Sequence, residues 1–354
     1  MPEGYEGKCH ELKVIQRSRA IKKPEDLMKL SLIYLSQSCS LLEVSELSKA
    51  MGIAEISDVA FMKKFGICNE WFKWILSQIK IEPLMNYAKP EKLEKYRLIS
   101  VDATTVSEKG ATKRNYKLHY GIELFTLSSS NYKITPETTG ESLRNFSIEP
   151  NDLVIADRAY GTKTSIEYCL ESGADFIFRM KNKAFKLYDV ANVEVDLLSF
   201  LNTTEEAKAS EIIVYMKGSK GMIPLRLCAI KKTDEEIEKT KKRLKDKESK
   251  KQKKYSDQTK ITHHYIFVLS SLPDFISTDE ILDIYRLRWQ VELYFKRLKS
   301  IMNFGELPKK KEESILAWLN GKLMVALLLE VLLAKAVFPP DEIESKSEEY
   351  LARS

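Results

Sequence analysis

The stretch NDLVIADRAYGTK, residues 151–163, decides the fold of this chain. Its apolar run from Leu153 to Ala156 is uninterrupted, as is typical of a parallel strand covered on both faces, and the run ends at Asp157. Thr162 or Thr164 can then cap a helix. The stretch therefore predicts a buried strand, a turn and a helix, with Asp157 at the carboxyl end of the strand.

The segments on either side predict further strands of the same sheet. Upstream, RLISVDATTV (97–106) is β-rich and carries Asp102, and YKLHYGIELFTL (116–127) alternates apolar and polar residues, so the two read as a hairpin pair. A third strand is expected near 132–135, and DFIFRMK (175–181) makes another downstream. Three antiparallel strands followed by alternating strand and helix predict an α/β fold, a mixed sheet flanked by helices.

A late segment, YRLRWQVELYFKRLK (285–299), places four functional side chains at helical spacing. On a helix, Tyr285, Arg288, Glu292 and Lys299 share a stripe about 60° wide. Arg forks onto phosphate, Lys acts as a point charge, and Glu can ligate a divalent cation. The alternative is a solvated helix face with ordinary ion pairs.

Three carboxylates can meet in such a fold. Ligands gather at the carboxyl ends of strands in open α/β sheets, which brings Asp102 and Asp157 within reach of Glu292. Three acidic groups repel one another, and a divalent metal would remove that conflict. Carboxylate oxygens suit Mg²⁺ or Mn²⁺, and two ions about 3.5 to 4 Å apart are the usual arrangement for cutting phosphodiesters.

These motifs together resemble the DDE transposases of the insertion-sequence-four family, which carry a Tyr-Arg-Glu-Lys signature. The matching residues are Asp102 in SVDATTV, Asp157 in IADRAYG, and Tyr285, Arg288, Glu292 and Lys299. The resemblance implies a ribonuclease H-like catalytic domain in which a β-rich insertion delays the last acidic residue. Asp157 and Glu292 are indeed 135 positions apart.

The resemblance also implies a division of the chain. The expected parts are a helical, helix-turn-helix-like DNA-binding domain (1–90), a ribonuclease H-like catalytic domain (91–186 and 264–338), a β-rich insertion (187–263) and an acidic tail (339–354). Within the insertion, ten of the sixteen residues from Lys239 to Lys254 are Lys or Arg. This run predicts a solvated helix or loop, with nonspecific contact to DNA phosphates as the alternative.

The N-terminal part carries the outline of a helix-turn-helix. LLEVSELSKAMGIAEISDVAFMKKF (41–65) reads as a helix, a short turn at Gly52 to Ala54, and a second helix ending in Lys63 and Lys64. The DNA-facing set would also include Lys73 and the aromatics Trp71, Phe72 and Trp74. A small helical bundle with core tryptophans is the open alternative.

Bulk composition favours an anionic partner. The 354 residues carry a formal net charge of +6 with a pI near 8.8, and nucleic acid is the leading candidate. The five scattered cysteines signal neither a disulfide framework nor a zinc site. The N-terminus shows no signal peptide, and the most apolar stretch, Leu323 to Leu333, is interrupted by Glu330 and too short for a bilayer. We expect a cytoplasmic, nucleoid-associated protein with no membrane partner.

By resemblance, the chain is a transposase that nicks transposon ends and joins them to target DNA. The resemblance implies that Asp102, Asp157 and Glu292 hold two Mg²⁺ (or Mn²⁺) ions. It further implies double-stranded DNA as partner and a homodimer in the synaptic complex. The residues expected to contact DNA are Tyr285, Arg288, Lys299, Arg179, Lys181, Lys63 and Lys64. For Arg179 and Lys181 the alternative is an ordinary surface pair at a strand end.

Two other classes of protein remain as alternatives. A non-cutting DNA-binding derivative of a transposase, acting as a regulator, would keep the fold, although the intact acidic triad argues against it. A glycosidase would use a carboxylate pair, but it would not need Arg288 and Lys299, and no aromatic sugar platforms are evident.

Overall fold

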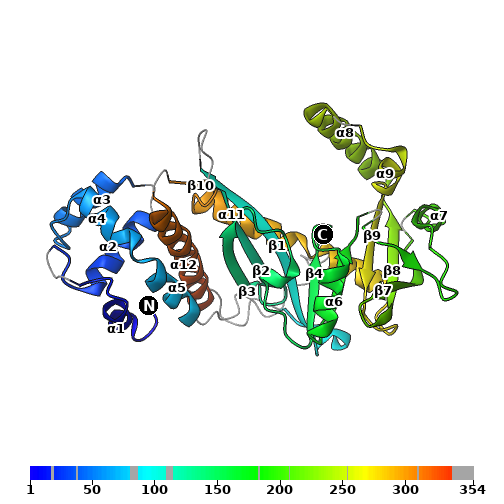
Figure 1. The fold of residues 1–354 in the computed structure, drawn as a ribbon, viewed down its shortest axis with the longest axis horizontal. Helices are drawn as coiled ribbons and strands as arrows, with labels where there is room; N and C mark the ends of the chain where they lie inside the picture. The colour runs from blue at the N-terminus through cyan, green and yellow to red at the C-terminus, as the bar shows by residue number, and fades with distance from the viewer. Residues whose placement is uncertain are drawn as a thin grey trace.

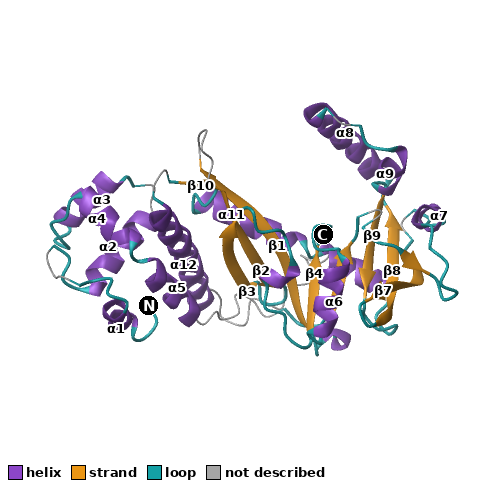
Figure 2. Cartoon of the chain, in the orientation of Figure 1, coloured by secondary structure: helices purple, strands orange, loops and turns teal. Residues whose placement is uncertain are grey.

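A ten-stranded mixed sheet runs through the protein, with helices on both faces (Figures 1 and 2). The computed structural model describes residues 1–16, 20–36, 39–79, 87–108, 115–181, 184–206, 208–252, 254–308 and 311–336. The strand order is β3-β2-β1-β4-β5-β9-β8-β7-β6, and β10 pairs with β1. The strands are β1 (Arg97–Glu108), β2 (Asn115–Glu123), β3 (Ser128–Pro136), β4 (Asp152–Ala156), β5 (Asp175–Arg179), β6 (Leu187–Tyr188), β7 (Ser210–Gly218), β8 (Gly221–Lys231), β9 (Tyr265–Ser270) and β10 (Glu306–Leu307).

The helices fall into an N-terminal group, a group around the sheet and one long final helix. The N-terminal helices are α1 (Tyr5–Glu11), α2 (Pro24–Ser36), α3 (Leu41–Ala50), α4 (Asp58–Gly66) and α5 (Asn69–Gln78). The remaining helices are α6 (Lys163–Glu171), α7 (Leu197–Asn202), α8 (Asp234–Lys251), α9 (Asp257–Thr262), α10 (Thr278–Arg286), α11 (Trp289–Ile301) and α12 (Glu312–Ala336), with 3₁₀ turns at Glu91–Leu93 and Leu143–Asn145.

The strand directions confirm the mixed sheet predicted from the sequence. β1, β2 and β3 form an antiparallel meander, whereas β1, β4 and β5 are mutually parallel. The stretch at 151–163 folds as predicted: β4 ends at Ala156, and the Thr162 side chain caps α6 by accepting from the backbone N–H of Ser165. This large mixed sheet flanked by helices is compatible with a ribonuclease H-like fold.

The two faces of the sheet bury alternate residues against different helices. On β4, Val154 and Ala156 face a core that includes Ile166 of α6, whereas Leu153 and Ile155 face a core that includes Ile281 of α10. Side chains alternate along a strand, so the parity of a residue number fixes its face. The sheet is therefore the middle layer between α6 and α10.

The insertion extends the sheet instead of forming a separate one. β9 pairs with β5, β8 with β9, and β7 with β8, all antiparallel. The basic run predicted as a helix or loop lies largely in α8, which projects beyond the sheet edge (Figure 1). The boundaries expected at residues 187 and 263 stay a prediction.

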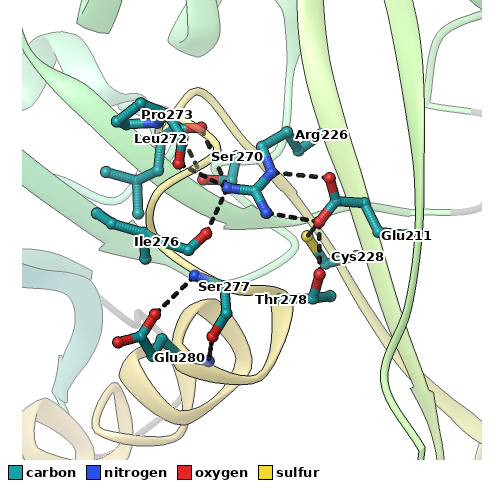
Figure 3. Close-up of polar contacts among 10 residues, drawn as sticks. All are labelled: Glu211, Arg226, Cys228, Ser270, Leu272, Pro273, Ile276, Ser277, Thr278 and Glu280. Carbon is teal, nitrogen blue, oxygen red and sulfur yellow. Dashed lines mark hydrogen bonds and ion pairs between the residues drawn. The ribbon is translucent and has the colours of Figure 1, made fainter.

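An ion pair between the buried Arg226 and the partly buried Glu211 ties the insertion to the start of α10 (Figure 3). Arg226 on β8 donates through Nε and Nη2 to both carboxylate oxygens of Glu211 on β7, at 2.9 and 2.6 Å. Its Nη1 donates to the carbonyls of Pro273 and Ile276 at 2.8 and 2.7 Å. Thr278, the first residue of α10, also donates to Glu211. The loop between β9 and α10 is thus fixed to the insertion strands.

The N-terminal helices share a core with α12, which the sequence analysis had assigned to the catalytic domain. A Cβ at Gly321 would lie 2.6 Å from a Leu35 methyl and 3.2 Å from the Phe72 ring, so α12 approaches α2 and α5 closely at this glycine. The divisions at residues 90 and 338 stay a prediction, since α12 packs on the N-terminal helices and also contacts β3.

The apolar character of α12 belongs to this core. Between Glu312 and Leu333 the helix is long and apolar enough to span a membrane by length and composition, so the apolar segment is longer than the predicted Leu323 to Leu333 stretch. In the structure, 72% of the apolar window is buried within the protein. Burial against other helices accounts for this hydropathy.

The helix-turn-helix prediction is only partly met. α3 and α4 are present, but Ser57 caps α4 at Asp58, so residues 51–57 separate the helices instead of the predicted turn at Gly52 to Ala54. That connection is longer than the three to four residues typical of the motif.

The aromatic residues of α5 were expected to face DNA, and for Trp71 and Phe72 this prediction was wrong. Both are fully buried in the helical core, and the Trp71 indole donates to the carbonyl of Tyr5 at 2.8 Å. Large rings gain more from burial than from exposure, and the indole N–H finds its partner inside. The alternative of a helical bundle with core tryptophans describes this pair.

Candidate active site

Asp102 and Asp157 lie on neighbouring parallel strands. Val101 pairs with Ala156 in the register of β1 and β4, so the two aspartates follow at matching positions. By strand alternation both belong to the face that carries Leu98 and Leu153, which is the face covered by α10. The sequence prediction that Asp157 follows the end of its strand is confirmed.

Burial and neighbouring acids perturb Asp102. Desolvation is the main cause that raises the pKa of Asp102 to about 6, and the charges of Asp157 and Glu292 raise it further. The backbone N–H of Ala103, which donates to Asp102 at 2.8 Å, and the charge of Arg288 oppose this. Asp102 is thus close enough to Asp157 and to Glu292 to be repelled by both.

The turn after β4 holds Asp157 and brings it beside the end of β5. The N–H of Ala159 donates to Asp157 Oδ1 at 2.6 Å. A Cβ at Gly161 would lie 2.2 Å from the carbonyl oxygen of Arg179, so only glycine permits this close approach of the turn to β5. Arg179 is thereby held next to the segment that carries Asp157.

Glu292 lies on α11 and is held by Arg288. An Arg288 Nη2 donates to Glu292 Oε1 at 2.5 Å, and the Arg288 side chain is largely buried whereas that of Glu292 is half exposed. Ser100 of β1 donates to the Arg288 carbonyl at 3.2 Å. Because Ser100 lies two residues before Asp102 on the same face, this bond fixes the start of α11 beside the aspartates.

The prediction of one helix from Tyr285 to Lys299 was wrong. α10 ends at Arg286 and α11 begins at Trp289, and the backbone between them tightens, with the N–H of Arg288 donating to Tyr285 three residues back. Because of this tighter turn, the side chains before and after it no longer point to the common helix face that was predicted for them. Tyr285 is buried beneath Arg288, 5.9 Å from the guanidinium to the ring centre, and Lys299 is exposed in the last turn of α11.

The donor chemistry of the site fits a hard divalent cation. Asp102, Asp157 and Glu292 supply only oxygen ligands, which Mg²⁺ and Mn²⁺ prefer. Within the described part of the chain, no three His, Cys, Asp or Glu side chains are grouped closely enough to hold a metal ion. Since Glu292 is paired with Arg288, it would have to exchange that partner to join the two aspartates.

Buried donors without partners surround the carboxylates. Among the described residues, Nε of Arg158, Arg179 and Arg288 and the hydroxyls of Tyr160 and Tyr285 are buried and have no hydrogen-bond partner. Burial, followed by the charge of Arg179, lowers the pKa of Arg158 to about 10. Buried donors are normally satisfied, so this concentration at one place marks a site for an acceptor-rich ligand. Arg158 and Tyr160 were not among the residues predicted to contact DNA, and only their position directly after Asp157 pointed to a role.

Several predicted DNA-binding residues lie away from the aspartates. Lys181 follows β5 and is exposed. Lys63 is exposed on α4 in the helical region, far from β1 and β4 in Figure 1. Lys64, in contrast, points inward and donates to the carbonyl of Val14 at 3.0 Å. The structure thus gathers Tyr285, Arg288 and Arg179 near the carboxylates, and leaves the four lysines outside.

Comparison with known proteins gives consistent results. The family described as "Transposase DDE domain" matches residues 93–328. InsL of insertion sequence element IS186A from Escherichia coli strain K12, described as a transposase, is 29% identical over 349 residues, or 96% of this chain and 93% of InsL. The transposase of IS421 from Escherichia coli is 29% identical over 350 residues, with the same coverage. The transposase of IS231F from Bacillus thuringiensis subsp. israelensis is 24% identical over 230 residues, which cover 60% of this chain and 48% of that protein.

Proposed function

Because the chain belongs to the family of DDE-domain transposases, and is thus a DNA transposase, we propose that Asp102, Asp157 and Glu292 are its catalytic carboxylates. The observation that carries this proposal is that Asp102 and Asp157 follow each other at matching positions of adjacent parallel strands. Glu292 lies near enough for its charge to act on Asp102. At a finer level we propose membership of the insertion-sequence-four group, on the Tyr285, Arg288, Glu292 and Lys299 spacing.

DDE transposase domains generally use divalent metal ions, and we propose two Mg²⁺ or Mn²⁺ ions held by Asp102, Asp157 and Glu292. When bound, such ions activate an oxygen nucleophile and stabilise the leaving oxygen of a phosphodiester. The protein supplies the oxygen ligands and their alignment. Release of Glu292 from Arg288 would both complete the ligand set and free the guanidinium.

The residues around the carboxylates are proposed to grip the DNA phosphates next to the cut. Arg288, Arg179 and Arg158 each have a buried, unpartnered Nε–H, and Tyr285 has an unpartnered hydroxyl. Phosphate oxygens accept hydrogen bonds from all of these groups, and arginine binds phosphate through two parallel hydrogen bonds. These contacts would fix the scissile phosphate in position, which is a large part of catalysis in phosphoryl transfer.

More distant contacts complete the proposal. Lys299, Lys181 and Lys63 are exposed and available to DNA, whereas Lys64 would first have to leave the Val14 carbonyl. We propose double-stranded transposon ends and target DNA as substrates, a homodimer in the synaptic complex, and action on the nucleoid in the cytoplasm.

The test uses the purified chain, a duplex carrying an end of the DNA element that encodes it, and Mg²⁺. The parent should nick the duplex. Asp102→Asn, Asp157→Asn and Glu292→Gln should bind the duplex yet cut it more than about 100-fold more slowly, since even outer partners of metal sites are worth about 10- to 100-fold. Asp283→Asn, at an exposed carboxylate of α10, is the matched control and should cut like the parent.

The outcomes separate the alternatives. Arg288→Ala should weaken the complex with the DNA end, whereas Glu292→Gln should bind and fail only in cutting. If the parent binds the duplex without nicking it, the chain is a non-cutting regulator. Nicking that survives all three carboxylate substitutions would overturn the assignment of the site.

A further inference from the structure

The hairpin of α8 and α9 stands on the same sheet edge as the catalytic carboxylates. β4 and β5 run parallel and end at this edge, and β9 runs antiparallel to β5 and begins there. Lys231, the last residue of β8, pairs with Tyr265, the first residue of β9, and the hairpin connects the two. The hairpin therefore rises from the edge to which β4 delivers Asp157 (Figure 1).

α8 is fixed by a narrow apolar face and presents cations elsewhere. Thr233 and Glu236 form a capping box at its N-terminus, and Ile237 and Leu244, two turns apart, are its buried apolar residues. Lys239 and Lys241 pair with glutamates of the same helix. Exposed cations without such pairs among the described residues follow at Lys242, Arg243, Lys245 and Lys247.

A row of partly buried cations lies between α8 and the carboxylates. Arg179 and Lys232 fall on the same sheet face as Asp157, by alternation along β5 and beyond β8. Lys232 donates to the His263 carbonyl at 2.9 Å and to Thr240 of α8 at 3.3 Å, so it sits at the root of the hairpin. Burial, then the charges of Arg179 and Arg158, lower the pKa of Lys232 to about 8.

His263 lies among the same cations. Burial lowers the pKa of His263 to about 4, and the charges of Arg158, Lys232, Arg179 and Lys247 lower it further. The set of cations acting on one imidazole thus spans from the residue after Asp157 to the exposed side of α8. Like charges held together in this way cost free energy unless an anion compensates them.

We propose that α8, together with Lys232 at its root, binds the phosphate backbone of duplex DNA that extends from the catalytic carboxylates across Arg158 and Arg179. The inference rests on the proposed function, because that function places the scissile phosphate at one end of this row of cations. An 18-residue helix is about 27 Å long, comparable to roughly eight base pairs of duplex. Contacts of this kind require only positive charge, so the surface would bind duplex of any sequence.

The experiment compares two variants of the full chain that lose equal charge at opposite sheet edges. One carries Lys242→Gln, Arg243→Gln, Lys245→Gln and Lys247→Gln on α8. The matched control carries Lys92→Gln, Lys95→Gln, Lys217→Gln and Lys220→Gln, which are exposed before β1 and at the turn between β7 and β8. Both variants and the parent are titrated with a random-sequence duplex over a range of salt concentrations.

The α8 variant should lose affinity by about tenfold for each phosphate contact removed at about 0.1 M salt, and the slope of log K against log salt should flatten by about 2 to 3. The control should keep the parental slope. If both variants lose the same affinity, the effect comes from net charge alone and the proposal is overturned. An α8 variant that keeps the parental salt slope would overturn it as well. Two double variants, Lys242→Gln with Lys245→Gln and Arg243→Gln with Lys247→Gln, guard against misfolding and should each give about half the effect.

Cutting distinguishes this inference from the function on which it rests. A short duplex that ends close to the cut does not reach α8, so at saturating concentrations the α8 variant should nick it like the parent. A parent that nicks nothing contradicts the proposed function. A parent that nicks, with an α8 variant of unchanged salt dependence on long duplex, contradicts only the role of α8.

Discussion

Two groups of arginine lie on the same face of the sheet, and they differ in whether their donors have partners. Arg226, at the edge where α10 begins, directs all three guanidinium nitrogens to Glu211 and to loop carbonyls (Figure 3). Arg158 and Arg179, at the edge of the carboxylates, each keep a buried Nε–H with no partner among the described residues. A guanidinium whose donors all have partners within the protein stabilises the fold. A guanidinium with an unpartnered donor can bind an acceptor on a ligand.

The physical reason lies in the cost of desolvation. A buried donor that loses water and gains no acceptor costs about 1 to 3 kcal/mol, and more when it is charged. We expect such an unfavourable desolvation to persist at a site where a bound ligand supplies the missing acceptor. Substitutions at the two groups should therefore separate stability from DNA binding.

The largest effect is expected at Arg226. Arg226→Met removes the buried partner of the pair and leaves Glu211 with Thr278 and Cys228 as its remaining donors. Breaking such a pair costs about 3 to 5 kcal/mol, so the free energy of unfolding, measured with urea, should fall by that amount. The loop before α10 should loosen as well, because it loses the bonds to Pro273 and Ile276.

The double variant Arg226→Met with Glu211→Leu is the control for this comparison. It removes both charges and should recover part of the loss, since apolar replacement of a whole buried pair is often neutral. If the single variant unfolds like the parent, Arg226 is not the satisfied structural group that its contacts indicate.

The sequence could predict the carboxylate edge far better than the Arg226 group. Asp157 was placed by an apolar run within its own strand, and Asp102 by a neighbouring run, because strand alternation and burial are local signals. The hydrogen-bond partners of Arg226 lie 15 to 50 positions away in the sequence, and no local sequence pattern predicts such contacts. The predictions also failed where tertiary packing decided the outcome.

α5 and α12 show this second kind of failure. Trp71 and Phe72 lie beside lysine and glutamate in the sequence and looked exposed, yet α12, about 250 positions later, contributes to covering them. The break between α10 and α11 lies where Ser100 of β1 donates a hydrogen bond to the Arg288 carbonyl. Helical periodicity within residues 285–299 carried no information about that strand.

The side chain of Glu330 combines the two situations seen in the arginines. One of its carboxylate oxygens accepts a hydrogen bond, and the other has no partner among the described residues. Tyr120 donates to Oε1 at 3.2 Å, while Oε2 and the hydroxyl of Tyr294 are buried without a partner among the described residues. Tyr120 and Tyr294 stack with ring centres 4.2 Å apart, which joins α12 to β2 and α11. Burial raises the pKa of Glu330 from 4.5 to about 7.

The second prediction follows from this raised pKa. Between pH 4.5 and about 7 the folded state keeps a proton that the unfolded state has lost, so stability should fall as pH rises through this window and level off above it. The loss is on the order of 3 kcal/mol. Glu330→Gln carries no titrating group and should flatten this part of the profile, measured by urea unfolding at about pH 5 and about pH 8. A variant whose stability keeps the parental dependence on pH would show that Glu330 does not titrate in this way.

The smallest effect on stability, and the sharpest contrast with Arg226, is expected at the other arginine group. Arg158→Met and Arg179→Met remove partly buried charges that repel each other and whose buried Nε donors have no partner, so the free energy of unfolding should stay constant or rise slightly. Binding of a DNA end should weaken by about 1.5 to 3 kcal/mol for each, the range for hydrogen bonds to charged groups. Arg144→Met, at an exposed arginine that rests on the Tyr168 ring, is the control and should bind DNA like the parent. Equal binding by all three variants, or unfolding of the Arg158 variant as easily as the Arg226 variant, would contradict the view that unpartnered buried donors mark the substrate site.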